Sequence, residues 1–352
     1  MTKLPLLALP FALVACLTGT PATTADAAGD AVDGGSTKPS TDGGSTPDTA
    51  TRPPSDAAIS VDATPPVFDA VAEASLPSLD ATGAVDGSFV DGGTASRCTM
   101  SPSMITCTSE TYTVITAATG ATPSESRLVY YQVPLGTPPA AGWPAVFMFQ
   151  GSFLSAAYTF SATSDEAYGL YYQTELVKNL LDAGYAVLAP EALDSGDSYW
   201  ETNIAPYATS WSGCADDLLV KAMLADVSAG TFGPLDAAKL YATGISSGGY
   251  MTSRMAVSYP GTFRSLAIES GSYATCLSSE CIVPTLAATH PPTLLLHGDL
   301  DTVVVPEATV TDYVTALKAA GVPENEIDDA ASGHQWIPEA PAAVLAWFMS
   351  HP

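Results

Sequence analysis

A serine within a glycine frame is the residue of this chain best placed for chemistry. The stretch 244–248 reads Gly-Ile-Ser-Ser-Gly, follows an apolar run typical of a strand and precedes a segment compatible with a helix. At such a turn, small residues let the strand and the helix pack closely around an exposed nucleophile. The frame selects Ser246 over Ser247, because Ser247 would have Ile245 where a glycine is required. Ser246 is therefore the predicted nucleophile of an acyl transfer.

A serine hydroxyl at its ordinary pKa is a poor nucleophile, so a base and a group that orients the base should follow it in the chain. The chain has four histidines. His290 precedes two prolines at a strand entry, His297 directly follows a predicted strand, and His351 is next to the last residue. His334 comes after the candidate acids, between the last predicted strand and the last predicted helix. This order predicts His334 as the general base.

The acid that orients the base is expected in the segment 297–301, which reads His-Gly-Asp-Leu-Asp and follows an apolar strand. Two carboxylates compete, those of Asp299 and Asp301. An acid on the loop beyond the strand end can reach a histidine, whereas one nearer the strand is more often held in the turn by hydrogen bonds to the backbone. The position favours Asp301 and leaves Asp299 as the alternative.

Strand-like and helix-like segments alternate through the C-terminal part of the chain, and they must bring these residues together. Apolar runs predict strands at 127–133, 145–149, 185–189, 239–243, 265–268 and 293–296, and a last one around Ile327. Helical patterns are predicted at 170–184, from 215 onward, and at 249–258, 306–320 and 338–349. The alternating run 127–133 indicates an edge strand, and the continuous run 145–149 an interior one. The fold class is therefore α/β, a mostly parallel sheet flanked by helices.

The charge and composition exclude several functions. The formal net charge of -26, from 37 acidic and 11 basic residues, excludes a nucleic-acid binder, because little could neutralise phosphates. With 47% hydrophobic and 14% charged residues, the chain is nonetheless typical of a globular protein. It has no dinucleotide-binding fingerprint or P-loop, and its histidines are not clustered with cysteines. We therefore expect no cofactor, no metal ion and a monomer.

The N-terminal third differs in composition from the rest. Residues 1–16 read as a lipoprotein signal peptide: an apolar stretch from Leu4 to Leu13, too short to span a bilayer, leads to Leu13-Val-Ala-Cys16, which resembles a bacterial lipobox. An ordinary signal peptide that carries Cys16 away is the alternative. Residues 17–96 are rich in Asp, Gly, Ser, Thr and Pro and are predicted to form a disordered linker, followed by a catalytic domain at 97–352.

These segments predict export. A lipid on Cys16 would anchor the chain to a membrane, as an outer-membrane or cell-surface lipoprotein, and the alternative signal peptide would give a secreted protein. The remaining cysteines fit this location. Short loops favour pairing Cys98 with Cys107 and Cys276 with Cys281, which leaves Cys214 unpaired, although spacing alone does not fix the connectivity.

Together, the three motifs resemble the α/β-hydrolase superfamily. The segments 244–251 (Gly-Ile-Ser-Ser-Gly-Gly-Tyr-Met), 297–301 and 333–336 (Gly-His-Gln-Trp), in this order, are most similar to polyhydroxyalkanoate-depolymerase-like esterases, relatives of feruloyl and acetylxylan esterases. In that family the last residue of His-Gly-x-x-Asp is the triad acid and the histidine of Gly-His-x-Trp is the base. The resemblance thus implies a triad of Ser246, Asp301 and His334, in agreement with the choices made from order and position.

The chain departs from the family at the predicted oxyanion hole. Where those esterases usually have His-Gly-Cys after the third strand, residues 150–152 read Gln-Gly-Ser. Backbone N–H groups stabilise the oxyanion, so a changed side chain need not abolish the function. The expected donors are the N–H groups of Ser247 and of Ser152 or Phe153. The pattern is also similar to oxidised poly(vinyl alcohol) hydrolases, which cleave β-diketones.

The resulting prediction is an exported serine carboxylester hydrolase that forms an acyl-enzyme and acts on polyesters such as polyhydroxyalkanoates or their oligomers. A β-diketone hydrolase, a feruloyl or acetylxylan esterase and a prolyl-oligopeptidase-type peptidase are the alternatives. Four aromatic residues near the site are predicted to line a groove for an apolar chain: Phe153, Trp200, Trp211 and Trp336.

Overall fold

The computed structural model describes residues 95–352, apart from 194–198, 203, 205, 277–281 and 305. The chain divides into units of residues 1–84 and 85–352, and every described residue belongs to the second. The predicted signal segment 1–16, with Cys16, and nearly all of the predicted linker 17–96 lie outside the described residues. No helix in the described part is both long enough and apolar enough to cross a membrane.

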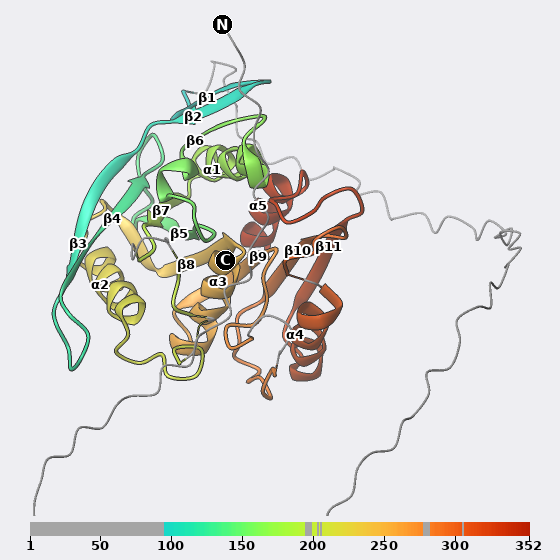
Figure 1. Ribbon diagram of the computed structural model, residues 1–352. Coiled ribbons are helices and arrows are strands. Elements are labelled where there is room, and N and C mark those ends of the chain that lie inside the picture. The colour runs from blue at the N-terminus through green and yellow to red at the C-terminus, as the bar shows by residue number, and fades with distance from the viewer. Residues whose placement is uncertain (1–94, 194–198, 203, 205, 277–281, 305) are drawn as a thin grey trace, which may run out of the picture. The chain divides into compact units, whose positions relative to one another are not determined.

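Within the described residues, eight strands form the main sheet, in the order β11-β10-β9-β8-β5-β7-β4-β3 (Figure 1). Their bounds are β3 (Glu110–Thr116), β4 (Glu125–Gln132), β5 (Trp143–Phe149), β7 (Ala186–Pro190), β8 (Leu235–Ile245), β9 (Phe263–Glu269), β10 (Thr293–Gly298) and β11 (Glu324–Asp329). All neighbours from β7 through β11 pair in parallel, whereas β4 is antiparallel to both β3 and β7. The predicted mostly parallel α/β sheet is confirmed.

One predicted strand has the wrong position in the sheet. The run 127–133 belongs to β4, which is paired on both sides, and the edge of the sheet is β3, which the sequence pattern did not reveal. An antiparallel pair can keep one face in solvent even inside a sheet, so alternation does not by itself mark an edge. Strand β3 escaped notice because only Val114 and Thr116 of its side chains are buried.

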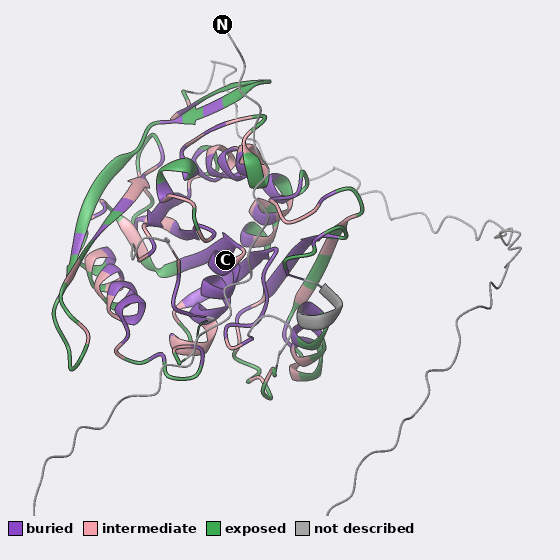
Figure 2. Cartoon of the chain, viewed as in Figure 1, coloured by how far each residue is buried: buried purple, intermediate pink, exposed green. Residues whose placement is uncertain are grey.

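Helices cover both faces of the sheet. Their bounds are α1 (Leu170–Asp182), α2 (Ala215–Ala229), α3 (Ser247–Ser258), α4 (Pro306–Ala320) and α5 (Ala340–Ser350). On β5, Val146 and Met148 join the core cluster under α1 and α5, and Phe147 and Phe149 join the one under α2 and α3. A third cluster packs α4 against β9 and β10. Burial on both faces explains the continuous apolar runs of these strands (Figure 2).

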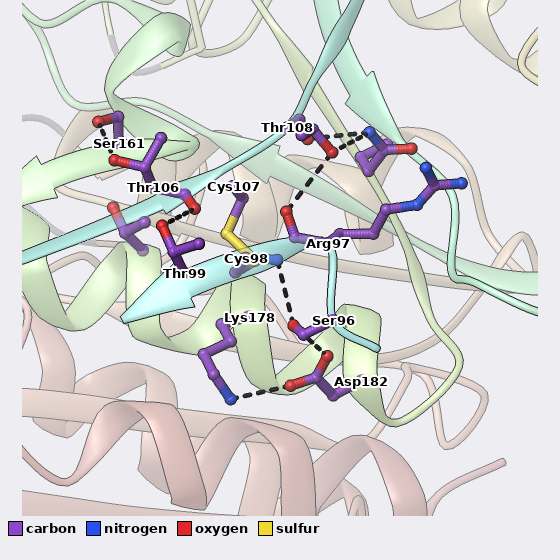
Figure 3. The surroundings of a disulfide bond; sticks show 12 residues. Ser96, Arg97, Cys98, Thr99, Thr106, Cys107, Thr108, Ser161, Lys178 and Asp182 are labelled. Carbon is purple, nitrogen blue, oxygen red and sulfur yellow. Dashed lines mark hydrogen bonds and ion pairs between the residues drawn. A yellow bond between two sulfur atoms is a disulfide. The ribbon is translucent and has the colours of Figure 1, made fainter. Parts of the chain in front are cut away.

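A second, three-stranded sheet consists of β1 (Cys98–Ser101), β2 (Met104–Cys107) and β6 (Ser161–Thr163), and the 3-10 helices η1 (Ala156–Thr159) and η2 (Ala167–Gly169) lie next to β6 in the chain. The predicted disulfide between Cys98 and Cys107 is confirmed and joins paired positions of β1 and β2 (Figure 3). Ser96 accepts a hydrogen bond from Cys98 N and donates one to Asp182 on α1, so contact with the domain begins one residue before its predicted start.

The other cysteine predictions differ in outcome. Cys214 is unpaired and buried within the described part, as predicted. Cys281 lies outside the described residues, so its pairing with Cys276 stays a prediction.

Replacing both Cys98 and Cys107 by serine should lower the free energy of unfolding by about 2–3 kcal/mol, because the disulfide removes the closure entropy of a short loop from the unfolded chain. Urea titration followed by circular dichroism measures the change. Under full reduction, the wild type and the variant should unfold at the same urea concentration. A difference that persists under reduction would show that the two cysteines stabilise the fold by packing and not by the cross-link.

Candidate active site

Ser246 stands at the turn between β8 and α3, partly exposed, with φ 58° and ψ -123°. A non-glycine residue at positive φ is strained, and such strain is typical of a nucleophile turn. A Cβ atom on either Gly244 or Gly248 would overlap the carbonyl oxygen of Phe149 at the end of β5. The two glycines therefore have the role that the sequence predicted for them: they let β8, α3 and the neighbouring strand approach closely around Ser246.

The two predicted oxyanion-hole residues lie side by side. Ser152, on the loop after β5, donates a hydrogen bond from Oγ to Ser247 Oγ at 3.0 Å. Ser247 is the first residue of α3, and the first backbone N–H groups of a helix have no partner within it. Phe153 follows Ser152 with φ 65°, an uncommon conformation that sharply turns the loop at this point. The position of Ser247 at the start of α3 leaves its N–H without a partner inside the helix, next to the loop that carries Ser152.

Gln150, which stands where related esterases usually have histidine, fixes the loop after β5 from within. Its side-chain amide donates to Leu154 O, and its side-chain oxygen accepts from Ala192 N at 3.4 Å. Its own carbonyl oxygen accepts a hydrogen bond from Trp200 Nε1 at 2.9 Å. The substituted residue thus holds the loop that carries Ser152.

His334 and Asp301 are hydrogen-bonded, with 2.8 Å between Nδ1 of the imidazole and Oδ2 of the carboxylate. A carboxylate oxygen is an acceptor, so Nδ1 carries the hydrogen and Nε2 has the free lone pair that a general base needs. Asp301 is buried with 4% exposure, whereas Asp299 is exposed. Of the two acids that the sequence left open, the structure pairs Asp301 with the histidine.

The Asp301 carboxylate is surrounded by N–H donors. Oδ1 accepts from Val303 N at 2.7 Å and from Val304 N at 2.9 Å. Oδ2 lies 3.2 Å from Nε2 of His297 in addition to its bond with His334. Burial opposes ionisation, but the hydrogen bonds from His297 and His334 outweigh it and hold the pKa of Asp301 well below its ordinary value. Asp301 is therefore an anion over the whole range in which a histidine titrates.

The loops that carry the acid and the base are fastened to each other. Leu300 N donates to Ser332 O, and Asp299 N donates to Asp329 O, each at 3.0 Å. At Gly298 the two loops approach so closely that a Cβ atom would overlap the backbone of Ser332. The contact explains the glycine of the His-Gly-Asp-Leu-Asp segment, since only glycine leaves room for it.

The end of β9 connects the serine turn with the histidine loop. Ser246 N donates to Glu269 O at 3.0 Å, and Ser270 Oγ donates to Gln335 O at 3.3 Å. Because Glu269 and Ser270 are consecutive, the nucleophile and the loop of His334 are attached to the same short piece of backbone. All three predicted catalytic residues thus lie at the carboxyl end of the parallel sheet, where α/β folds form their sites.

A second buried acid lies close to the first. Glu269 has no exposed surface, and burial raises its pKa well above its ordinary value, with a further increase from the nearby charge of Asp301. Burial therefore favours the protonated, neutral form of Glu269. In the described part of the chain, no group of three or more His, Cys, Asp or Glu side chains is arranged to hold a metal ion.

The tryptophans predicted to line a substrate groove are instead core residues. Trp200 and Trp336 have 0% exposure and Trp211 has 6%, and the indole of Trp211 donates to Tyr259 OH at 3.2 Å. Aromatic rings contribute most to stability when they are buried, so these indoles pack into the core, where they also fix the backbone of the loops. Phe153, with 70% exposure, is the one of the four that faces solvent.

Two neighbours of the site were missed from the sequence. His297 was noted for its place after a strand and as the first residue of the segment that carries the acid, but not as a contact of the acid, although a histidine four residues before the acid could have signalled one. Tyr168 packs edge-on against the His334 ring with the ring centroids 6.5 Å apart, and Trp336 N donates to its carbonyl oxygen at 2.9 Å. No sequence signal pointed to Tyr168, because it lies far from His334 in the chain.

Comparison with known proteins gives one strong relative. No family model matches the chain. The chain is 45% identical over 265 residues to a poly(3-hydroxyoctanoate) depolymerase of Pseudomonas fluorescens, across 73% of this chain and 92% of that protein. Among solved structures, a Bacillus cereus carboxylesterase is 13% identical with a TM-score of 0.46, covering 64% of this chain and 95% of its own. An S-formylglutathione hydrolase of Agrobacterium tumefaciens is 13% identical with a TM-score of 0.47, covering 72% and 98%.

The mostly parallel sheet was expected from the alternation of strands and helices, and the serine turn and the pairing of Asp301 with His334 from the resemblance. The identity to the depolymerase extends over nearly all of that protein. The chain is a carboxylic ester hydrolase with the α/β-hydrolase fold, and it belongs to the polyhydroxyalkanoate depolymerase family.

Proposed function

We propose that the protein hydrolyses the ester bonds of polyhydroxyalkanoates with medium-length side chains, or of their oligomers, by a Ser246-His334-Asp301 triad. The observation that most directly supports the triad is the 2.8 Å hydrogen bond from Nδ1 of His334 to Asp301, which leaves Nε2 as the base. The strained, partly exposed position of Ser246 at the start of α3 supports its role as nucleophile.

In the first half of the reaction, Nε2 of His334 takes the proton of Ser246 Oγ while Oγ forms a bond to the ester carbonyl carbon. The carbonyl oxygen becomes an oxyanion, stabilised by the N–H groups of Ser247 and of Ser152 or Phe153. When the intermediate collapses, the ester C–O bond breaks, and the His334 proton passes to the departing alcohol. Ser246 is left as an acyl ester.

In the second half, His334 takes a proton from a water molecule, and the resulting hydroxide adds to the acyl carbon. Collapse breaks the bond to Oγ, Ser246 regains the proton, and the carboxylic acid leaves. Asp301 stays ionised throughout, orients the ring through Nδ1 and stabilises the imidazolium that forms twice in each cycle.

The apolar surroundings of the site support a polymer with aliphatic side chains. Four exposed apolar residues, which we call the apolar rim, stand next to the proposed catalytic residues: Phe153, Tyr168, Leu300 and Val303, with exposures of 70%, 40%, 62% and 61%. Phe153 follows Ser152, Tyr168 contacts His334, and Leu300 and Val303 stand close to Asp301 on its loop. The name of the 45% identical relative, a poly(3-hydroxyoctanoate) depolymerase, supports the same substrate.

The purified protein should release 3-hydroxyoctanoate and its oligomers from an emulsion of poly(3-hydroxyoctanoate), measured by turbidity loss and chromatography of the products. A panel of poly(3-hydroxybutyrate), feruloyl and acetylxylan esters, oxidised poly(vinyl alcohol) and peptide anilides tests the alternatives. Ser246→Ala should lower kcat by about 10⁶-fold, since the acyl-enzyme can no longer form.

The outcomes separate the substrate from the chemistry. Faster turnover of another panel member than of poly(3-hydroxyoctanoate) would replace the substrate and keep the triad. Full activity of a folded Ser246→Ala variant on every ester would contradict the triad itself.

Asp301→Asn should lower kcat on a p-nitrophenyl ester by about 10⁴-fold, because the amide would leave His334 in the wrong tautomer. Asp299→Asn is the matched control: the same chemical change two residues away, at an exposed side chain, should leave kcat within about threefold of wild type, as expected for a surface change away from the reaction. Steady-state kinetics of the two variants decides between the acids. Loss of activity in Asp299→Asn alone would reverse the assignment.

We further infer that the protein is exported and anchored through a lipid on Cys16. The lipobox-like segment 13–16 supports the anchor, and the disulfide between Cys98 and Cys107 supports an oxidising compartment. Several acyl chains would hold the protein durably, at roughly 0.8 kcal/mol for each buried methylene group.

Cys16→Ser should prevent acylation when the chain is expressed with its own leader in a bacterial host. The wild type should incorporate an alkyne-labelled fatty acid and sediment with membranes, whereas the variant should not be labelled. If neither protein is labelled and both are recovered in the medium, the segment is an ordinary signal peptide.

A further inference from the structure

The imidazole of His297 contacts the acid of the proposed triad at the same carboxylate oxygen that binds His334. His297 lies near the end of β10 with 2% exposure. Its Nε2 atom is 2.7 Å from Val304 O and 3.2 Å from Asp301 Oδ2. Both partners are acceptors, so Nε2 carries a hydrogen and donates it to the two oxygens. Oδ2 of Asp301 therefore receives N–H groups from two imidazoles.

We propose that His297 is a positioning residue for ester hydrolysis, acting through Asp301 on the basicity and orientation of His334. The inference rests on the proposed triad and goes beyond it, because His297 does not contact the reacting atoms. Its hydrogen bond to Val304 O closes the turn that begins at Asp301, and in this turn Val303 N and Val304 N reach Oδ1. The carboxylate is thereby fixed with Oδ2 toward His334.

The shared oxygen also determines how strongly His334 holds a proton. A carboxylate oxygen that accepts a second N–H has less charge to offer to the first, so it stabilises the imidazolium of His334 less. A base that is protonated before the substrate arrives cannot accept the proton of Ser246. The proposed role of His297 is therefore to limit how strongly Asp301 stabilises the imidazolium of His334.

Other ionisable groups near His297 must stay constant in any test. Asp328 is the position paired with His297 across β10 and β11, and Asp299 lies on the same turn. The charge of Asp301 acts on Glu269, which lies at the end of β9. A change at His297 leaves these three carboxyl groups in place, so a shift in the pH profile can be assigned to the lost hydrogen bond.

The test compares three variants of the full-length protein with p-nitrophenyl octanoate as the substrate. His297→Gln is the conservative variant, because its terminal amide N–H can reach the position of Nε2. His297→Met fills a similar volume without a donor. His297→Asn keeps a polar side chain, but its shorter reach removes the bond to Asp301, so it decides the matter if the methionine variant fails to fold.

We expect kcat of His297→Met and His297→Asn to fall by about 10- to 100-fold, as for loss of one hydrogen bond to a charged group, with KM nearly unchanged. The acid limb of kcat/KM should move to higher pH by about half a unit or more, because His334 then binds its proton more tightly. His297→Gln should restore most of kcat and the original limb.

Wild-type kcat and an unmoved acid limb in a folded donor-free variant would overturn the inference. An equal loss in all three variants with an unmoved limb would also overturn it, since it would indicate packing alone. The control with Ser246→Ala separates this inference from the triad. If Ser246→Ala is inactive while the His297 variants behave as wild type, the triad stands and only the role of His297 fails.

Discussion

The buried negative charge of Asp301 is the constraint on which the site depends. An ionised carboxylate removed from water is costly unless N–H groups replace the lost hydration. Among the described residues, four N–H groups do so: Val303 N, Val304 N, His297 Nε2 and His334 Nδ1. Two of them require a tight turn directly after β10, and the other two require histidines on separate segments. The charge and the local backbone conformation therefore depend on each other, and neither is stable alone.

The acid loop and the serine turn must both lie close to neighbouring backbone. Glycines allow this close approach because they have no side chain. At Gly298 the acid loop lies against the backbone of Ser332, and at Gly248 the serine turn lies against Phe149. Each glycine brings two backbones into contact, Gly298 at the last residue of β10 and Gly248 just after the end of β8. Because these strands end at one edge of the sheet, Ser246, Asp301 and His334 all lie at that edge although they are far apart in the chain.

The sequence was sufficient for those features whose physical cause is local. The close packing around Ser246 requires small residues, and the triad requires the acid to precede the base along the chain. Both requirements leave a pattern that can be read in the sequence. The tryptophans were misjudged because an aromatic residue on a loop looks the same whether it faces a substrate or the core. Trp200 is buried because Gln150 offers its indole a carbonyl partner, and only the folded loop reveals this contact. Similarly, His297 became significant only when the turn brought Val304 O and Asp301 Oδ2 to the same ring atom.

Glu269 and Asp301 show why the number of N–H donors matters more than burial. Both carboxyl groups are buried and lie near each other, yet burial dominates at Glu269 and raises its pKa, while hydrogen bonds dominate at Asp301 and lower it. If both were ionised, the two like charges would repel each other. Burial of Glu269 thus disfavours a second negative charge beside Asp301. In the proposed mechanism, Asp301 stabilises the imidazolium that forms when Ser246 reacts, and in the proposed role of His297 the second donor on Oδ2 limits this stabilisation.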